Sequence, residues 1–410
     1  MQAQPPHYHL LAKPAGAACN LSCTYCFFLS KENLYPNDRY FMDEETLEIY
    51  IRQLLQSSPG PQVEIAWQGG EPMLRGLDFY QRTVELAEKY RRADQQIQHT
   101  IQTNATLVDE KWARFFRQHN FLVGVSFDGP PAMHDTYRVD RKGKGTFDHV
   151  LRGWNCLQHH EVDTNVLCTV HAGNADHPLE VYKFFRDELK AHYIQLIPIV
   201  ERATEQTIAL ANQGWGGLKG KDRPLYRQEG TRVTARSVSA EQFGSFLIGI
   251  FDEWVKRDVG RVYVTTFDVA LGSWLGQHNS CLVAPTCGAS LALEHNGDVY
   301  SCDHFVEPLH RLGNIKNTPL DMLVASEQQR RFGDAKFDTL PHYCKQCPVL
   351  FACYGECPRN RFIQTPDGEP GLNYLCAGYR AFFTHINPAM KTMAGLLRQG
   401  RYADEIMALD

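Results

Sequence analysis

Short apolar stretches alternate with amphipathic stretches through the first half of the chain. The amphipathic stretches space their apolar residues as one face of a helix does, and Asp43 is placed to cap the first of them. The apolar stretches are short and often β-branched, which is typical of strands buried on both faces. The predicted strands are His9–Lys13, Val63–Trp67, Ile97–Thr103, Leu122–Phe127, Asp163–Val170 and Tyr193–Ile199, and the later helices are Leu77–Arg91, Asp109–His119, Phe147–His160 and Leu179–Lys190.

Six strand–helix units in succession predict an α/β fold whose parallel sheet curls into a full or partial barrel. In barrels of this kind the ligand site lies at the C-terminal ends of the strands. Residues that directly follow a predicted strand are therefore the first candidates for chemistry.

The alternation stops at residues 201–237, which are rich in glycine, lysine and arginine. We predict a long loop or flexible insertion here, because loops of this length are either functional lids and binding loops or disordered. Order is expected to restart with a helix over Ala240–Lys256. The chain from Cys281 to Cys376 is rich in cysteines and turns, so its small core needs metal clusters as staples. A last helix is predicted over Tyr379–Leu397.

Composition places the 410-residue chain among ordinary globular proteins, with 43% hydrophobic residues, 22% charged residues and a net charge of −5. That charge argues against a nucleic-acid binder. No apolar run reaches the ~18–20 residues of a membrane helix, and residues 1–14 lack an export signal. We therefore expect a cytoplasmic protein that binds neither nucleic acid nor membrane. In a reducing compartment its 13 cysteines favour metal binding over disulfides.

Three cysteines follow the first predicted strand with the spacing C-x3-C-x2-C: Cys19, Cys23 and Cys26. Iron–sulfur clusters are usually held by four thiolates, so three leave one iron with an open site. An open iron can bind and activate a small molecule, which favours catalysis. The alternative is a zinc site completed by His7 or His9, but its ligand spacing would be unusual.

A second motif, Gly69-Gly70-Glu71-Pro72, follows the second predicted strand. The glycines allow backbone to come close to a ligand, and the carboxylate of Glu71 can accept hydrogen bonds from an amine. Alone this sequence could be a simple turn. Beside the three cysteines, on the same face of a barrel, it indicates a cofactor site.

Together the two motifs resemble those of the radical S-adenosylmethionine (radical SAM) enzymes, and Tyr25 matches the aromatic residue that precedes the last cysteine of their signature. The resemblance implies a partial (β/α)6 barrel and a 4Fe–4S cluster on Cys19, Cys23 and Cys26. It also implies that the open iron chelates S-adenosyl-L-methionine, which an electron then cleaves to a 5′-deoxyadenosyl radical.

Eight cysteines in the second half make two complete sets of four. Part of their spacing, Cys344-x2-Cys347, is also common in zinc sites. The whole pattern resembles the SPASM domain, which carries two auxiliary 4Fe–4S clusters in peptide-modifying radical SAM enzymes. By that resemblance the first auxiliary cluster is held by Cys281, Cys287, Cys302 and Cys357, and the second by Cys344, Cys347, Cys353 and Cys376.

Within this class the chain is similar to the anaerobic sulfatase-maturating enzymes. The similarity rests on the blocks Ala66–Pro72, Gln102–Asn104, Ser126–Pro130, His134–Arg138, Glu294–Asp303 and Asn373–Cys376. Carried over residue by residue, it implies that Asp303 is the general base and that contacts to S-adenosylmethionine come from Tyr25, Gly69, Gly70, Glu71, Pro72, Ser126, Arg138 and Val200.

The resemblance implies an oxidoreductase that converts one Cys or Ser of a sulfatase precursor to Cα-formylglycine. It implies three domains, namely the barrel over residues 1–237, a SPASM-type domain over 238–385 and a helical tail over 386–410. A low-potential electron donor such as flavodoxin or ferredoxin is expected as a partner. Two alternatives stay open: a radical SAM/SPASM maturase that makes a thioether, a carbon–carbon crosslink or an epimer in another peptide, and a non-enzymatic zinc-binding module.

Overall fold

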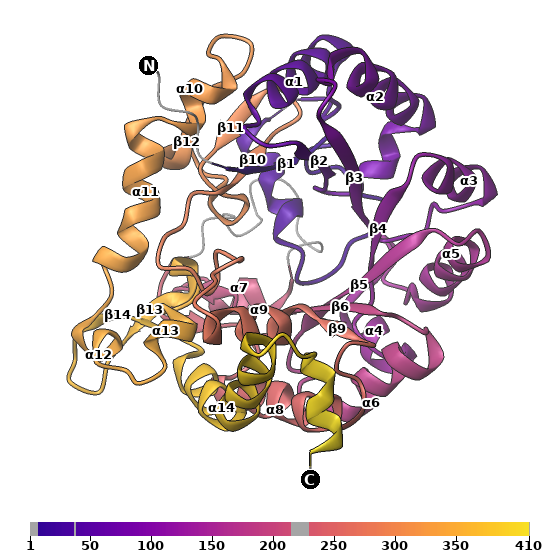
Figure 1. Ribbon diagram of the computed structural model, residues 1–410. Coiled ribbons are helices and arrows are strands. Elements are labelled where there is room, and N and C mark those ends of the chain that lie inside the picture. The colour runs from indigo at the N-terminus through magenta and orange to yellow at the C-terminus, as the bar shows by residue number, and fades with distance from the viewer. Residues whose placement is uncertain (1–6, 37, 215–228, 410) are drawn as a thin grey trace.

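A ten-stranded sheet forms the centre of the molecule in the computed structural model, which describes residues 7–36, 38–214 and 229–409 (Figure 1). The strand order is β12-β11-β10-β1-β2-β3-β4-β5-β6-β9, so β12 and β9 are the edges of an open sheet. All neighbours from β10 to β9 run parallel, whereas β10, β11 and β12 are antiparallel. The predicted partial barrel is therefore confirmed.

The six predicted strands are confirmed, and each begins and ends within one residue of its predicted bounds. They are β1 (His9–Ala12), β2 (Gln62–Trp67), β3 (Gln96–Thr103), β4 (Phe121–Ser126), β5 (Asp163–Val170) and β6 (Tyr193–Pro198). A short strand, β9 (Tyr263–Val264), was not predicted and adds to the sheet beside β6.

The predicted helices are confirmed as the outer layer of the sheet (Figure 1). Asp43 caps the first of them, accepting a hydrogen bond of 2.7 Å from the Thr46 amide. One helix was not predicted: α4 begins with a proline at its first position, which is a common start for a helix. The layer consists of α1 (Glu44–Ser57), α2 (Leu77–Tyr90), α3 (Glu110–Gln118), α4 (Pro131–Tyr137), α5 (Phe147–His159) and α6 (Pro178–Lys183), which continues as a π-helical turn over Phe184–Glu188.

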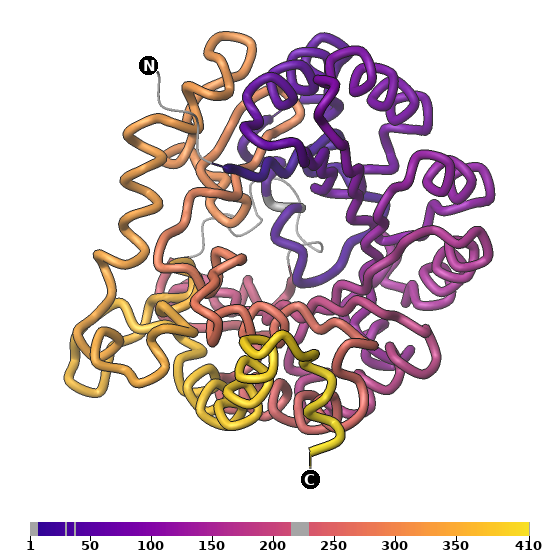
Figure 2. The backbone as a smooth tube through the Cα atoms, viewed as in Figure 1, coloured from indigo at the N-terminus to yellow at the C-terminus, as the bar shows by residue number. Residues whose placement is uncertain are grey.

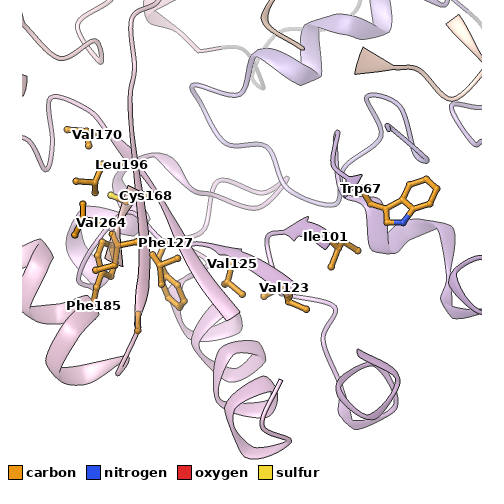
Figure 3. Packing of buried hydrophobic residues seen from close by; sticks show 14 of the residues in the cluster. Trp67, Ile101, Val123, Val125, Phe127, Cys168, Val170, Phe185, Leu196 and Val264 are labelled. Atoms are coloured by element: carbon orange, nitrogen blue, oxygen red, sulfur yellow. The ribbon is translucent and has the colours of Figure 1, made fainter. Parts of the chain in front are cut away.

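The core lies between the sheet and this helical layer (Figure 3). Ile101, Val123 and Val125 come from neighbouring strands and are at most 2% exposed. Cys168, which matches no ligand position, is fully buried in the same core. Its thiol therefore behaves as a small apolar side chain.

Residues 201–237 are more ordered than predicted at both ends. Strands β7 (Arg202–Ala203) and β8 (Arg232–Val233) pair, and α7 (Ile208–Asn212) lies between them in sequence. Arg236 anchors this part of the chain through ion pairs with Glu201 and hydrogen bonds to the Ala211 and Asn212 carbonyls. The middle of the predicted insertion, residues 215–228, lies outside the described residues.

The first part of the cysteine-rich half continues the barrel sheet, whereas β13 and β14 form a separate two-stranded sheet. Figure 2 shows the chain of this half, in orange, beside the N-terminal part of the barrel. Strand β10 (Ser290–Leu293) pairs in parallel with β1 and leads through β11 (Asp298–Tyr300) to β12 (Arg311–Asn314). The remaining elements are α8 (Ala240–Arg257), α9 (Thr265–Trp274), α10 (Leu320–Val324), α11 (Glu327–Asp338), α12 (His342–Lys345), α13 (Leu350–Cys353), β13 (Arg361–Gln364), β14 (Pro370–Asn373) and α14 (Cys376–Arg398).

Helix α14 packs along α8, and the expected domain border at residues 385 and 386 falls inside it. The two helices touch through glycines, because a Cβ on Gly378 would lie 2.0 Å from the Ala240 carbonyl oxygen. Among the described residues, no helix combines the length and the apolar character needed to cross a membrane.

The Gly378 contact predicts that Gly378→Ala forces α8 and α14 apart. We expect a loss of about 1–3 kcal/mol in the free energy of unfolding, as for other overpacked contacts. Gly395→Ala in the same helix is the matched control, since a Cβ there meets nothing within 4 Å. It should leave stability unchanged or raise it by about 0.5–1 kcal/mol. Urea unfolding of both cluster-loaded variants measures the difference, and equal midpoints would contradict the packing argument.

Candidate functional site

The first three cysteines lie on the loop that leaves the C-terminal end of β1. The pKa of Cys23 is raised to about 12, mainly by burial and in part by the nearby Cys26 thiol. Burial also raises the pKa of Cys19, and the neighbouring Cys26 and Cys23 thiols raise it too. The three thiols therefore lie together, at the barrel end where a ligand site is expected.

The Gly69–Pro72 loop packs directly on the backbone that leads to Cys19. The Gly70 amide donates to the Gly16 carbonyl at 2.8 Å, and the Glu71 amide donates to the Ala18 carbonyl at 2.8 Å. A Cβ on Gly70 would lie 2.0 Å from the Ala18 oxygen, so only glycine fits. The two sequence motifs are thus one structural unit, and neither can move without the other.

The carboxylate of Glu71 points into the protein. It is fully buried and accepts hydrogen bonds from the Met73 amide (3.0 Å), the Thr103 hydroxyl (2.7 Å) and the Asn104 amide (2.9 Å). Burial raises the pKa of Glu71 to about 7 against the lowering effect of these bonds. Its carboxylate, for which the sequence suggested an amine partner, ties the end of β2 to the end of β3.

Tyr25 and Arg138 meet on one buried carboxylate, that of Asp128. The Tyr25 hydroxyl donates to Asp128 Oδ2 at 2.6 Å, and Arg138 Nε lies 3.0 Å from the same oxygen. Asp128 is fully buried, and His171 Nε2 lies 3.7 Å from it. Burial alone would raise the pKa of Asp128, but Arg138, His171 and His134 together outweigh burial and hold the pKa below its usual value.

This arrangement shows that Arg138 is an interior residue, only 7% exposed, and that Asp128 positions it. Ser126, at the end of β4, accepts a hydrogen bond of 3.0 Å from Gln102. Val200 lies just beyond the end of β6 and is 8% exposed. The predicted cofactor contacts therefore gather at the C-terminal ends of the strands.

The eight later thiols form two groups that cross in sequence, because Cys357 follows Cys353 but belongs with the three earlier cysteines. The ionisation of Cys302 responds to Cys281 and Cys287, and that of Cys357 responds to Cys302 and Cys287. The thiols of the second group also influence one another. Burial raises the pKa of Cys376, and Cys344 and Cys347 raise it too. Burial raises the pKa of Cys353, and Cys376 and Cys344 add to this effect.

Each later group supplies four thiols, which is the donor set of a complete 4Fe–4S cluster. All 13 cysteines are free of disulfides. The donor chemistry therefore fits iron–sulfur clusters, one on each group of thiols.

Asp303 stands between the barrel and the first group of later thiols. Its Oδ1 lies 2.6 Å from Nζ of Lys13, a fully buried cation at the end of β1. The Lys31 ammonium donates to the Asp303 carbonyl at 3.4 Å. Burial alone would raise the pKa of Asp303, but Lys13 and Lys31 outweigh it and hold the pKa below its usual value.

Sequence reasoning missed Lys13 and Asp128 as members of the site. Asp128 could have been found, because it follows a buried strand inside a block already noted as similar to the family. For Lys13 the sequence holds no such signal, since a lysine that ends a strand is normally solvent-exposed. Its burial depends on Asp303, 290 residues further along the chain.

The comparisons with known proteins agree with this site. The family model of the radical SAM superfamily matches residues 14–185, and that of an iron–sulfur cluster-binding (SPASM) domain matches residues 285–348. A serine-type anaerobic sulfatase-maturating enzyme from Bacteroides thetaiotaomicron is 46% identical over 94% of this chain and 91% of its own length. A cysteine-type enzyme from Clostridium perfringens is 32% identical over 96% and 100%.

Among solved structures, native anSMEcpe with bound AdoMet matches with a TM-score of 0.80 and 33% identity, over 94% of this chain and 99% of that one. The same protein with AdoMet and the Cp18Cys peptide also gives 0.80. The protein is thus a radical SAM oxidoreductase that uses three 4Fe–4S clusters and S-adenosylmethionine. From its sequence and its fold, the chain belongs to the family of anaerobic sulfatase-maturating enzymes.

Proposed function

We propose that the enzyme oxidises one Cys or Ser of a sulfatase precursor to Cα-formylglycine. The names of the relatives and the peptide-bound structure of anSMEcpe support this activity. The observation that carries it is Asp303, a buried and ionised carboxylate held between the barrel mouth and the first group of later thiols. Family membership contradicts the alternative of a non-enzymatic zinc-binding module.

We assign Cys19, Cys23 and Cys26 to the cluster that binds S-adenosylmethionine. When bound there, the cluster and the cofactor would supply a 5′-deoxyadenosyl radical able to remove a hydrogen atom from Cβ of the target residue. Tyr25, Ser126, Arg138 and Val200 orient the cofactor. The Gly69–Pro72 loop contributes backbone, because the Glu71 carboxylate is already occupied by three hydrogen bonds from its own chain. Asp128 holds Arg138 in place.

Asp303 accepts the proton of the target thiol or hydroxyl. A general base must be ionised before the reaction, and the ion pair with Lys13 keeps the Asp303 carboxylate in that form. Loss of this proton makes the substrate radical a stronger reductant, so its electron can leave. Asp303 directly follows Cys302, which we assign with Cys281, Cys287 and Cys357 to the first auxiliary cluster. The site of proton loss and the electron acceptor are therefore neighbours.

The second auxiliary cluster is assigned to Cys344, Cys347, Cys353 and Cys376. A low-potential protein such as flavodoxin or ferredoxin is proposed as the electron donor to the chain. We also propose that the enzyme works in the cytoplasm, because its cysteines are needed as free thiols for the clusters.

Asp303→Asn removes the proposed base and keeps the shape of the side chain. We expect formation of the aldehyde to fall by about 10²–10⁴-fold, the usual contribution of general-base catalysis. Cleavage of S-adenosylmethionine to 5′-deoxyadenosine should continue. Mass spectrometry of a Cys-x-Pro-x-Arg peptide and of its Ser counterpart, after anaerobic incubation, measures both products.

Asp298→Asn is the matched control for this variant. Asp298 is a buried carboxylate of the neighbouring hairpin, and it too pairs with a cation, Arg311. Its loss should lower stability without changing the aldehyde formed per molecule of S-adenosylmethionine cleaved. Unchanged aldehyde formation by Asp303→Asn would remove Asp303 from the mechanism.

Glu71→Gln distinguishes a structural from a cofactor-binding carboxylate. The new amide group sets an N–H against the Asn104 N–H or Thr103 hydroxyl, which leaves a buried donor unpaired. We expect a loss of about 1–3 kcal/mol in stability together with weaker binding of S-adenosylmethionine. Urea unfolding and equilibrium dialysis measure the two effects, with the exposed Glu88→Gln as control. Weaker binding at unchanged stability would show that the carboxylate contacts the cofactor itself.

A further inference from the structure

A histidine contacts one thiol of the first auxiliary group. His304 Nδ1 lies 3.4 Å from Cys357 Sγ, although the two residues are 53 positions apart. His304 directly follows Asp303, so the imidazole lies near both the proposed base and the proposed cluster. A thiolate bound to iron carries no proton, and a hydrogen bond to it can run only from Nδ1–H to the sulfur.

Arg359 holds this histidine from the other side. Its Nη1 donates a hydrogen bond of 2.7 Å to the His304 carbonyl, and its guanidinium lies over the Phe27 ring, 5.1 Å from the centroid. Arg359 also interacts electrostatically with Cys357 and Cys302. A hydrogen-bond donor and a fixed cation therefore face the same thiols.

Hydrogen bonds to sulfur and nearby positive charge are two of the levers that set the reduction potential of an iron–sulfur cluster. Both stabilise the extra negative charge of the reduced form. We propose that His304, positioned by Arg359, raises the potential of the first auxiliary cluster and so makes it the acceptor of the substrate electron. This inference rests on the proposed function for the assignment of Cys357 as a ligand.

The electron balance of the step is complete within the proposed reaction. The target residue loses a hydrogen atom to the 5′-deoxyadenosyl radical and a proton to Asp303. The remaining electron leaves as the carbon–sulfur or carbon–oxygen double bond forms, and the oxidised first auxiliary cluster would accept it. With a Cys target, water then hydrolyses the thioaldehyde to the aldehyde and releases hydrogen sulfide. A higher potential makes only the electron transfer more favourable.

In the described part of the chain, the second auxiliary group lacks a comparable hydrogen bond from a histidine to one of its thiols. Among the residues that the structure describes, no histidine donates to Cys344, Cys347, Cys353 or Cys376. Lys13 and Lys31 also lie on the side of the first group, beside Asp303. The second group has cations near it as well, Arg361 near Cys344 and Arg380 near Cys376. The hydrogen bond from a histidine to sulfur is therefore the feature that distinguishes the first group, where the electron leaves the substrate.

The test measures the potential of the cluster in full-length protein. The background carries Cys19→Ala, Cys23→Ala and Cys26→Ala, so that only the two auxiliary clusters contribute to the spectrum. His304→Leu removes the donor, whereas His304→Asn keeps an N–H at the position of Nδ1. His342→Leu is the matched control, since His342 lies two residues before Cys344 and is exposed. Anaerobic EPR titration gives the midpoint potentials, and iron analysis gives the cluster content.

For His304→Leu we expect full iron content and at least a tenfold weaker affinity of one cluster for an electron, a downward shift of about 59 mV. His304→Asn should restore most of the shift, and His342→Leu should leave both potentials unchanged. Unchanged potentials in an iron-replete His304→Leu protein would overturn the proposal. If His304→Leu loses iron, the Asn variant decides: full iron with a normal potential supports the proposal, and full iron with a lowered one overturns it.

Two further measurements separate this inference from the function on which it rests. Cys357→Ala in the same background should lose one of the two clusters, and retention of both would refute the ligand assignment and the inference together. Aldehyde formation by the wild-type enzyme tests the function alone. If the protein makes no aldehyde but His304→Leu still lowers the potential, the role of His304 is supported and the proposed reaction is refuted.

Discussion

The pairing of β1 with β10 is the contact on which the rest of the site depends. Its register joins His9 to Ser290 and Ala12 to Leu293, which makes the cysteine-rich half an extension of the barrel sheet. The cysteine loop leaves one side of this pair, and the hairpin that carries Asp303 leaves the other. Lys13, at the end of the pairing, is buried where the two meet. A buried cation needs a close partner, so its ion pair with Asp303 ties the two halves together.

Charge is distributed unevenly around the two ends of the proposed reaction. Near Cys19 the nearest buried carboxyl is Glu71, which burial makes reluctant to ionise. Near Cys302 lie Lys13, Lys31 and Arg359, all wholly or largely buried. In the first environment Glu71 is reluctant to ionise and Arg138 balances the charge of Asp128, so little net negative charge lies beside the cysteines that we assign to the radical-generating cluster. The second stabilises negative charge where a proton and an electron arrive.

Much of the fold could be predicted because local patterns and tertiary structure agree. Short β-branched runs became strands, and Asp43 became a helix cap. The predictions failed where a long-range partner decides the outcome. The burial of Lys13 depends on Asp303, and the order at both ends of residues 201–237 depends on Arg236. Neither contact is marked in the sequence by a hydrophobic period or by a turn residue. Both can therefore be seen only in the folded structure.

The crossed grouping of the later cysteines was implied by family resemblance and could not come from spacing. A buried lysine and a partly buried arginine supply a physical reason for it. The Lys336 ammonium donates to the carbonyls of Cys281, Leu282 and Ala284, and Arg361 donates to those of Tyr354, Glu356 and Lys336 itself. The loops before Cys287 and before Cys357 are thereby fastened to the same helix, α11. Because the protein's own side chains hold these loops together, the site for the first auxiliary cluster is largely preformed by the chain itself.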